Sequence, residues 1–224
     1  MRNIHRLFFS FILGSLPFTP LQAKETSTFF WDASKEIAIA KSAAPENISA
    51  NATVWVLTKA GYKKAIEGSN GFNCLVMRKW SAIFDVQKDL FEWDDLVAPV
   101  CFDPVSSKGQ MIEQFRRHKL GLAGKSHDEI KTAIYTEYAE GKIPTPDAVS
   151  FSFMYSAAQK LSPQIMHGHP HVMVYAPNYT NDMLGGATPM SGDPIVFEAP
   201  GTFRATVAIP VNGRSQHIEP VISE

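Results

Sequence analysis

The sequence predicts an α+β domain with a mainly antiparallel sheet and a central helical pair packed on one side. Strand-like runs fill the first and last thirds of the chain that follows the N-terminal segment, and two helical runs fill the middle. Several strand-like runs alternate apolar and polar residues with a period of two. Strands, then helices, then strands again favour a segregated α+β fold over repeated β-α-β units.

The first third is expected to hold one helix and several strands. The helix covers residues 32–45, with Asp32 or Ser34 as its cap and Pro45 as its stop. Strands are predicted at 51–58, at 72–80 and around Val100 and Cys101. The segment 61–71 between the first two is predicted as a helical turn or loop that closes on Asn70-Gly71.

The middle and last thirds complete the α+β pattern. Two helices are expected over 106–124 and 126–142, and the second opens with Ser126 and Glu129 at the spacing of a capping box. Strands are then predicted at 148–155 and 171–177, followed by a hairpin over 194–211 that turns at 199–201.

The N-terminus has the pattern of a secretory signal. Arg2 and Arg6 precede the apolar run 7–18, and "TPLQA" ends in a small residue at Ala23. Cleavage after Ala23 would leave a single domain over 24–224 in the periplasm or outside the cell. The alternative is an uncleaved N-terminal membrane anchor, although the run is short for a membrane span. No later segment is long and apolar enough to cross a membrane.

The charge balance excludes one class of partner. The chain has 21 basic and 22 acidic side chains, and loss of Arg2 and Arg6 leaves 19 against 22, a formal net charge of −3. This mild acidity gives no electrostatic reason to expect a nucleic acid or an anionic membrane surface as partner. A small molecule remains the expected partner, and the sequence defines no oligomeric state.

The two cysteines, Cys74 and Cys101, allow two interpretations. In an oxidising compartment an even pair predicts a disulfide. The closed loop of 28 residues would stabilise the fold by about 3.6 kcal/mol in the loop-entropy model. The alternative is a thiol nucleophile at Cys101 in "PVCFDP" with a histidine as base, although no cysteine-hydrolase signature surrounds it.

The stretch "IMHGHPHVMVY" carries the main candidate site. His167, His169 and His171 alternate, so in an extended chain their rings share one side, and Pro170 favours extension. Two imidazoles and a carboxylate from elsewhere would suit zinc or copper. The other interpretations are acid–base or ligand-binding chemistry, and ordinary polar residues at the start of a strand. We take His169 and His171 as the candidate metal pair.

Two further residues complete the predicted ligand site. Tyr175, with Asn178, follows the histidines and could line a pocket mouth, although a tyrosine at a strand end is often simply packed. Arg78 shares a strand face with Cys74 and could clamp a carboxylate or phosphate. Arg78 could equally pair with one of the acids in "FEWDD", and we favour that pairing.

Four segments together carry a resemblance: "SAAPENIS", "VWVLTKAGYKKAIEGSNGFNCLVMR", "PVCFD" and "HPHVMVYAP". The chain resembles a group of signal-bearing bacterial exported proteins of uncharacterised activity. The resemblance implies export and a common fold, and it favours His169 and His171 over His167 as the pair to test. It implies no catalytic residue.

Three functions follow from these observations. The leading hypothesis is an exported protein that binds a small ligand near Arg78, His169, His171 and Tyr175. The second is a metal-assisted or cysteine–histidine hydrolase, and the third is a non-catalytic interaction protein of the cell envelope.

Overall fold

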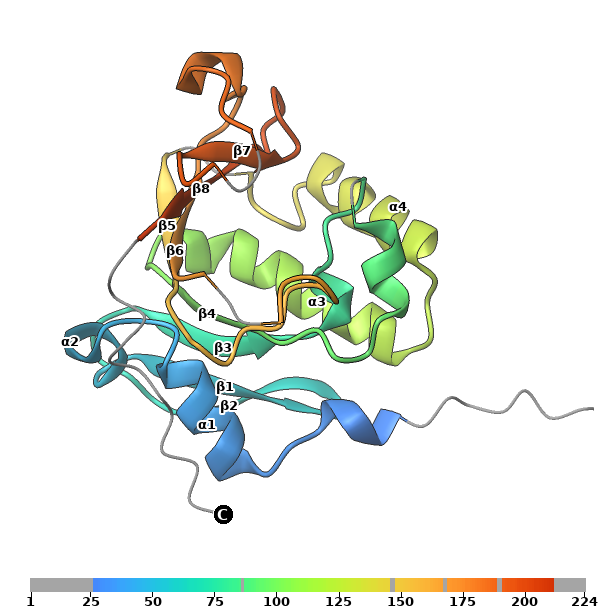
Figure 1. Cartoon of the computed structure of the whole chain (residues 1–224). Helices are drawn as coiled ribbons and strands as arrows, with labels where there is room; N and C mark the ends of the chain where they lie inside the picture. The colour runs from blue at the N-terminus through green and yellow to red at the C-terminus, as the bar shows by residue number, and fades with distance from the viewer. Residues whose placement is uncertain (1–25, 86, 146–147, 167–168, 189–190, 212–224) are drawn as a thin grey trace, which may run out of the picture.

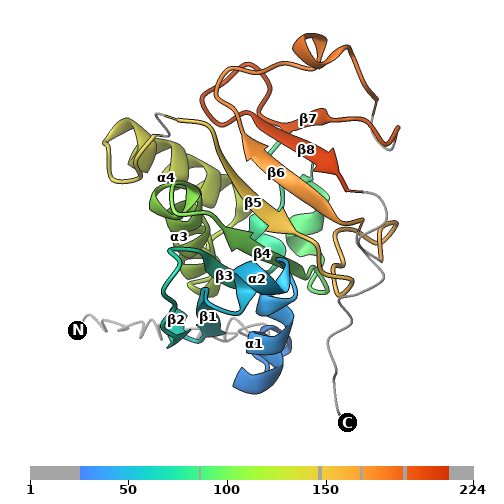
Figure 2. The ribbon, with the colours of Figure 1, turned by 90° about the vertical axis from the view of Figure 1, so that its left-hand side faces the viewer.

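The computed structural model describes residues 26–85, 87–145, 148–166, 169–188 and 191–211, and within them eight strands form one sheet. The strand order is β2-β1-β3-β4-β5-β6-β8-β7 (Figures 1 and 2). Of the paired strands, β1 and β3 run parallel and every other pair is antiparallel. The strands are β1 (Thr53–Thr58), β2 (Gly61–Ile66), β3 (Asn73–Met77), β4 (Ala98–Phe102), β5 (Ser150–Met154), β6 (His171–Tyr175), β7 (Ile195–Glu198) and β8 (Thr206–Pro210).

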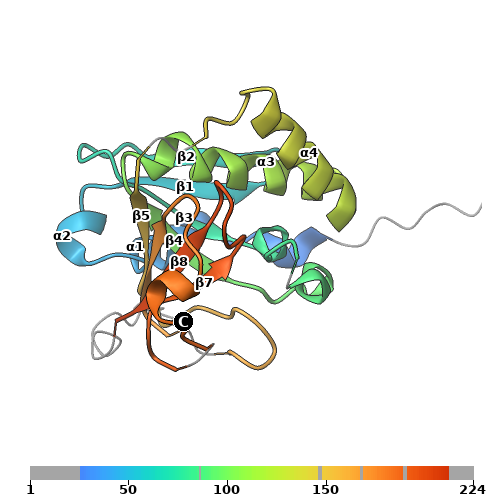
Figure 3. The ribbon, with the colours of Figure 1, turned by 90° about the horizontal axis from the view of Figure 1, so that it is seen from above.

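Helices cover the sheet unequally. α1 (Ala33–Lys41) and the short α2 (Glu46–Ser49) lie on one side of the sheet, while α3 (Gln110–Leu122) and α4 (His127–Ala139) lie together on the other (Figures 1 and 3). Short 3₁₀ turns fill the connections: η1 (Thr26–Phe29), η2 (Lys79–Ser81), η3 (Lys88–Glu92), η4 (Ser106–Lys108) and η5 (Asp182–Leu184). The predicted fold class, a mainly antiparallel sheet with a helical pair on one side, is confirmed.

Alternation along β3 explains how the sheet carries a core on each face. Cys74 and Val76 are fully buried against α1, where they meet Ile39 and Ala40. Leu75, between them, points to the other face and packs in the cluster that includes residues of α3. Because successive side chains of a strand alternate sides, one short strand serves both layers.

Local signals correctly predicted several element boundaries. Asp32 caps α1 by accepting a hydrogen bond from the Ser34 N–H, as one of the two alternatives expected. Ser126 and Glu129 form the predicted capping box of α4. β7 and β8 pair antiparallel across the 199–205 connection, as the hairpin prediction required.

The prediction of a helical turn or loop at 61–71 was wrong, because residues 61–66 form the edge strand β2. A tight turn joins β1 to β2, with Thr58 opposite Gly61 and with Gly61 at φ +103°. That φ is easy for glycine and strained for other residues. Lys63 and Lys64 face solvent, and exposed lysines on an edge strand hinder pairing with another chain.

The predicted disulfide is present. Cys74 and Cys101 stand directly opposite each other on β3 and β4, with their Cα atoms 4.0 Å apart. Both are completely buried. Since the sulfur of Cys101 is bonded, it cannot act as the thiol nucleophile that a cysteine–histidine hydrolase needs.

Among the described residues, no helix has the length and apolar character to cross a membrane. The proposed signal segment 1–23 lies outside the described residues.

Candidate functional site

His169 and His171 fall at the start of β6. His169 is exposed and precedes the strand, whereas the half-buried His171 pairs with Met154 of β5 and Pro210 of β8. The His171 Nδ1 lies 2.6 Å from the backbone oxygen of His169, and because a carbonyl oxygen only accepts, Nδ1 is the protonated nitrogen. Burial lowers the pKa of His171, which keeps the ring neutral at pH 7. His167 lies outside the described residues.

The structure does not support the zinc or copper hypothesis at His169 and His171. Within the described ranges, no three histidine, cysteine, aspartate or glutamate side chains gather closely enough to hold a metal ion. Protein zinc sites use three or four such ligands. The carboxylate that the hypothesis needed from elsewhere in the chain is not found in the part of the chain that the structure describes.

Arg78 is buried inside the fold, with an exposed fraction of only 1%. Its Nη2 lies 2.5 Å from Glu36 Oε2 and also donates to the backbone oxygen of Phe29. Its Nη1 donates to the backbone oxygen of Val76 at 2.8 Å, and its guanidinium carbon lies 4.0 Å from the ring centre of Trp31. The guanidinium is therefore occupied by the protein itself and presents no open position for a ligand.

The favoured pairing of Arg78 with an acid of "FEWDD" needs correction. The partner of Arg78 is Glu36 on α1, 42 residues earlier in the chain. The acid Asp94 of "FEWDD" instead accepts from Lys79 at 2.7 Å. Arg78 and Lys79 are neighbours in sequence, but Arg78 points into the α1 side of the fold and Lys79 reaches the loop after η3.

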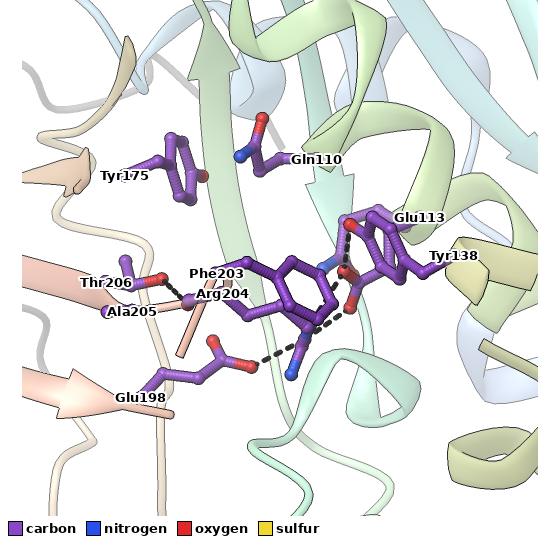
Figure 4. Close-up of a pocket in the computed structure, with 10 residues that line it drawn as sticks. Gln110, Glu113, Tyr138, Tyr175, Glu198, Phe203, Arg204, Ala205 and Thr206 are labelled. Atoms are coloured by element: carbon purple, nitrogen blue, oxygen red, sulfur yellow. Dashed lines mark hydrogen bonds and ion pairs between the residues drawn. The ribbon is translucent and has the colours of Figure 1, made fainter. Parts of the chain in front are cut away.

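Tyr175, the last residue of β6, lines a pocket between the sheet and the helical pair (Figure 4). The lining polar side chains come from α3, α4, β6, β7 and the β7–β8 connection, and they include Gln110, Glu113, Tyr138, Tyr175, Glu198 and Arg204. The cavity volume is about 30 Å³. A cavity of roughly 10–15 Å³ on this measure holds one water, so the pocket accommodates about two water-sized groups.

Glu113 on α3 is the centre of the charged network beside this pocket. Its Oε1 lies 2.6 Å from Arg204 Nη2 and 3.3 Å from Arg117 Nη1. Its Oε2 accepts from the Tyr138 hydroxyl at 2.8 Å. Arg204 Nη2 also reaches Glu198 Oε1 at 2.9 Å, so the arginine joins the two carboxylates (Figure 4).

The network holds its groups in fixed protonation states. Burial by itself raises the pKa of Glu113, but the charges of Arg204 and Arg117 and the hydrogen bonds from Arg204 and Tyr138 outweigh it, so that pKa lies below its ordinary value. Burial and the nearby carboxylate of Glu113 raise the pKa of Tyr138. At neutral pH Glu113 is therefore an anion with its lone pairs occupied, and Tyr138 is a neutral donor.

A strained turn orients the pocket wall that carries Arg204. Ala199 follows β7 with φ +47°, and Asn178 on the neighbouring loop has φ +68°. For a non-glycine residue such a conformation costs on the order of 1–3 kcal/mol and persists only where surrounding contacts enforce it. Here Thr202 supplies them: its N–H and hydroxyl donate to the Ala199 oxygen, and its own oxygen accepts from the Asn178 N–H.

Gln114, another residue of the pocket lining, has a buried side-chain oxygen without a partner. Its Oε1 is buried and has no hydrogen-bond partner among the described residues. A buried polar atom without a partner costs roughly 1–3 kcal/mol. Gln110, Glu113 and Gln114 have the i, i+3, i+4 spacing of one helix face, and all three line the pocket.

The described lining of the pocket omits several side chains that are common in catalytic sites. Among the described residues that line it there is no histidine, cysteine, serine or lysine. The Tyr175 hydroxyl shares a hydrogen bond with Ser152 at 3.0 Å, and burial raises the pKa of Tyr175. With Tyr175 protonated and Glu113 saturated by donors, neither of these two residues is available as a general base near pH 7.

The structure separates the predicted ligand-site residues into three places. Tyr175 alone lines the pocket, and Arg78 is buried on the α1 side of the sheet. His171 lies on the same strand face as Tyr175 but four residues away, about 13 Å along an extended strand. The histidine pair therefore stands outside the pocket.

Sequence reasoning missed Glu113, Glu198 and Arg204. Glu113 and Arg117 have the i, i+4 spacing of an ordinary surface pair, and Arg204 is 91 residues from Glu113. The burial of Glu113 between the sheet and the helical pair is visible only after folding.

Comparison of the chain with protein-family models, curated proteins and solved structures finds no match. The fold and the site define the class of protein: an α+β protein with a small, charged pocket between a sheet and a helical pair.

Proposed function

We propose that this is an exported protein that binds a small polar ligand, or the polar end of a larger one, in the pocket beside Tyr175 and Arg204. The observation that carries this proposal is the convergence of charged and polar side chains from five separate elements on one cavity. Clefts with a few convergent polar groups are the usual form of a ligand site. Of the residues in the leading sequence-based hypothesis, Tyr175 stays in the proposed site. Arg78, His169 and His171 are not part of it, and Glu113, Glu198 and Arg204 are added.

Export is supported by the signal-like N-terminus and by the disulfide. Disulfides persist in oxidising compartments outside the cytosol, so Cys74–Cys101 is consistent with the periplasm or the exterior. We expect mass spectrometry of the protein recovered from the periplasm or medium to give an N-terminus at Lys24. An intact N-terminus at Met1 in membrane fractions would instead support the uncleaved anchor.

The binding proposal is tested by NMR titration of the protein 24–224 with three small probes: propylammonium, propionate and 1-propanol. We expect at least one probe to shift the ring resonances of Tyr138 and Tyr175 in a saturable way. Tyr175→Phe removes a lining hydroxyl and should weaken that binding. Tyr179→Phe is the matched control, because Tyr179 is exposed and outside the pocket lining.

If none of the three probes shifts these resonances in a saturable way, the binding proposal is wrong. Equal weakening by both tyrosine variants would also contradict it, because the probe would then bind elsewhere on the surface.

A further inference from the structure

The sheet face opposite the pocket is largely uncovered over β5, β6 and β8. On this face α1 packs on β1, β3 and β4, and Leu184 of η5 packs at the other end, beside β7 and β8. Figure 2 shows the three strands open between these two covers. Phe151 and Phe153 of β5 belong to the open face, because Ser152 between them bonds to Tyr175 on the pocket side.

The side chains on the open face form a continuous apolar surface. Cross-strand pairing aligns them in two rows, Phe153–Val172–Ile209 and Phe151–Val174–Val207. The ring of Phe72 extends this surface, with its centre 6.2 Å from that of Phe153. Phe72 and Phe153 are only half-buried, and Ile209 is 36% exposed. Contiguous exposed apolar surface of this kind marks an interaction site.

The described part of the chain ends at the edge of this same face. Val211, two residues after Ile209, donates its N–H to the Pro170 oxygen at 2.8 Å, which fixes the end of β8 beside the start of β6. Residues 212–224 follow and lie outside the described residues. The stretch from Val211 to Ile218 reaches up to about 23 Å when extended, whereas β5 lies two strand spacings from β8, about 10 Å. Residues from Ile218 onward can therefore reach all three open strands.

The sequence of this C-terminal segment has an apolar side when it is extended. In "HIEPVISE", which covers residues 217–224, Ile218, Pro220 and Ile222 stand at every second position and share one side. Pro220 also disfavours a helix at the residue before it. A single segment of this length has no core of its own, so its apolar side can be buried only against another surface.

We propose that residues 217–224 pack across the open face of β5, β6 and β8, with Ile218 and Ile222 against Phe153 and Val172. The occupant of the face is thus the C-terminal segment of the same chain. Because a short tether joins the two surfaces, the effective concentration of the segment is in the millimolar range, which favours it over a second copy of the protein in dilute solution. The proposal concerns the face opposite the pocket and does not depend on the pocket's ligand.

The test places a nitroxide spin label on Ser223→Cys in the protein 24–224 and measures NMR line broadening. Cys74 and Cys101 are completely buried in their disulfide, so the new cysteine is the one that reacts. The isotope-enriched, spin-labelled protein is diluted into unmodified protein without isotopes, so that only contacts within one chain are seen. We expect the side-chain resonances of Phe151 and Val172 to broaden and to recover when the nitroxide is reduced.

Two variants of the same labelled protein test which side chains hold the segment. Ile218→Ser/Ile222→Ser removes the apolar side and should abolish most of the broadening at Phe151 and Val172. Val221→Ser is the matched control, because it removes an apolar side chain from the opposite side of an extended segment and should retain most of the broadening. The tether is identical in every variant, so broadening from a segment that merely moves nearby is the same in all of them.

Three results would overturn the proposal. The first is broadening that Ile218→Ser/Ile222→Ser leaves unchanged, since the segment would then be near the face without binding it. The second is broadening at Phe151 and Val172 no greater than at Ile134, which lies on α4 behind the sheet. The third is broadening in a mixture where label and isotopes are on different chains, which would assign the face to a second copy.

Discussion

His118 gives the sharpest prediction about stability. The residue is completely buried on α3. Its Nε2 accepts a hydrogen bond from the backbone N–H of Arg78 at 2.8 Å, and its Nδ1 donates to the backbone oxygen of Gln114 at 2.8 Å. Protonation of Nε2 would destroy the first hydrogen bond and place a charge in the core. Burial accordingly lowers the pKa of His118 to about 3, against 6.5 for an ordinary histidine.

Acidification should therefore destabilise the protein through this residue. Between pH 6.5 and 3 the unfolded chain binds a proton at His118 that the native protein does not, so the free energy of unfolding falls as the pH falls. Each pH unit in this window costs about 1.4 kcal/mol. At pH 5.0, 1.5 units below the unfolded pKa, His118 alone should account for a loss of about 2 kcal/mol.

The measurement is urea unfolding followed by tryptophan fluorescence at several pH values from 7.5 to 5.0. His118→Gln removes the titrating ring but keeps an acceptor for the Arg78 N–H. We expect the unmodified protein to lose about 2 kcal/mol more over this range than His118→Gln does. His169→Gln, which alters an exposed histidine, should follow the unmodified protein.

The comparison of slopes removes the contribution of other histidines, because they titrate in both proteins. It also avoids the lower pH range in which carboxylates gain protons. Parallel pH curves for the unmodified protein and His118→Gln would refute the assignment of His118 as a neutral core acceptor.

Three further outcomes are expected. Glu113→Gln leaves the buried Arg117 without its carboxylate partner and Arg204 with Glu198 alone, and should cost about 3–5 kcal/mol in urea unfolding, whereas Glu92→Gln should change stability by less than about 0.5 kcal/mol. The native protein should show no free thiol. A Cys74→Ala/Cys101→Ala variant should lose about 3.6 kcal/mol of unfolding free energy, and an unchanged urea midpoint would contradict the loop-entropy estimate. Ala199→Gly should relieve the positive φ and keep or slightly raise the thermal midpoint, and a clear decrease would contradict the strain argument.

Sequence patterns predicted those elements whose signals are local. The α4 capping box depends on two residues three positions apart, and the 194–211 hairpin on a short turn between alternating runs. The segment 61–66 failed because Lys63 and Lys64 interrupt the apolar alternation of an edge strand that is buried only near Gly61. Its pairing with β1 is what makes it a strand, and that information lies outside the segment.

For the candidate site, the sequence could predict only those features that depend on the type and position of a single residue. Tyr175 was placed at a pocket mouth from its position at a strand end, and it does line the pocket. Arg78 was recognised as an arginine in need of an acid, yet its partner Glu36 lies on α1 and not in the nearby acidic loop. Residue type showed the need for a partner, and the fold determined which one.

The contrast between the two buried ion-pair systems shows why the Glu113 network is the better candidate site. Replacing a buried ion pair by apolar residues is often neutral or stabilising, so burial of charge is weak evidence of a stabilising role. The Arg78–Glu36 pair is buried as deeply as the Glu113 network, and the Glu113 network lines a cavity. Beside that cavity Gln114 has an unpaired oxygen. The proposed ligand site therefore rests on the cavity beside the Glu113 network and not on the burial of its charges.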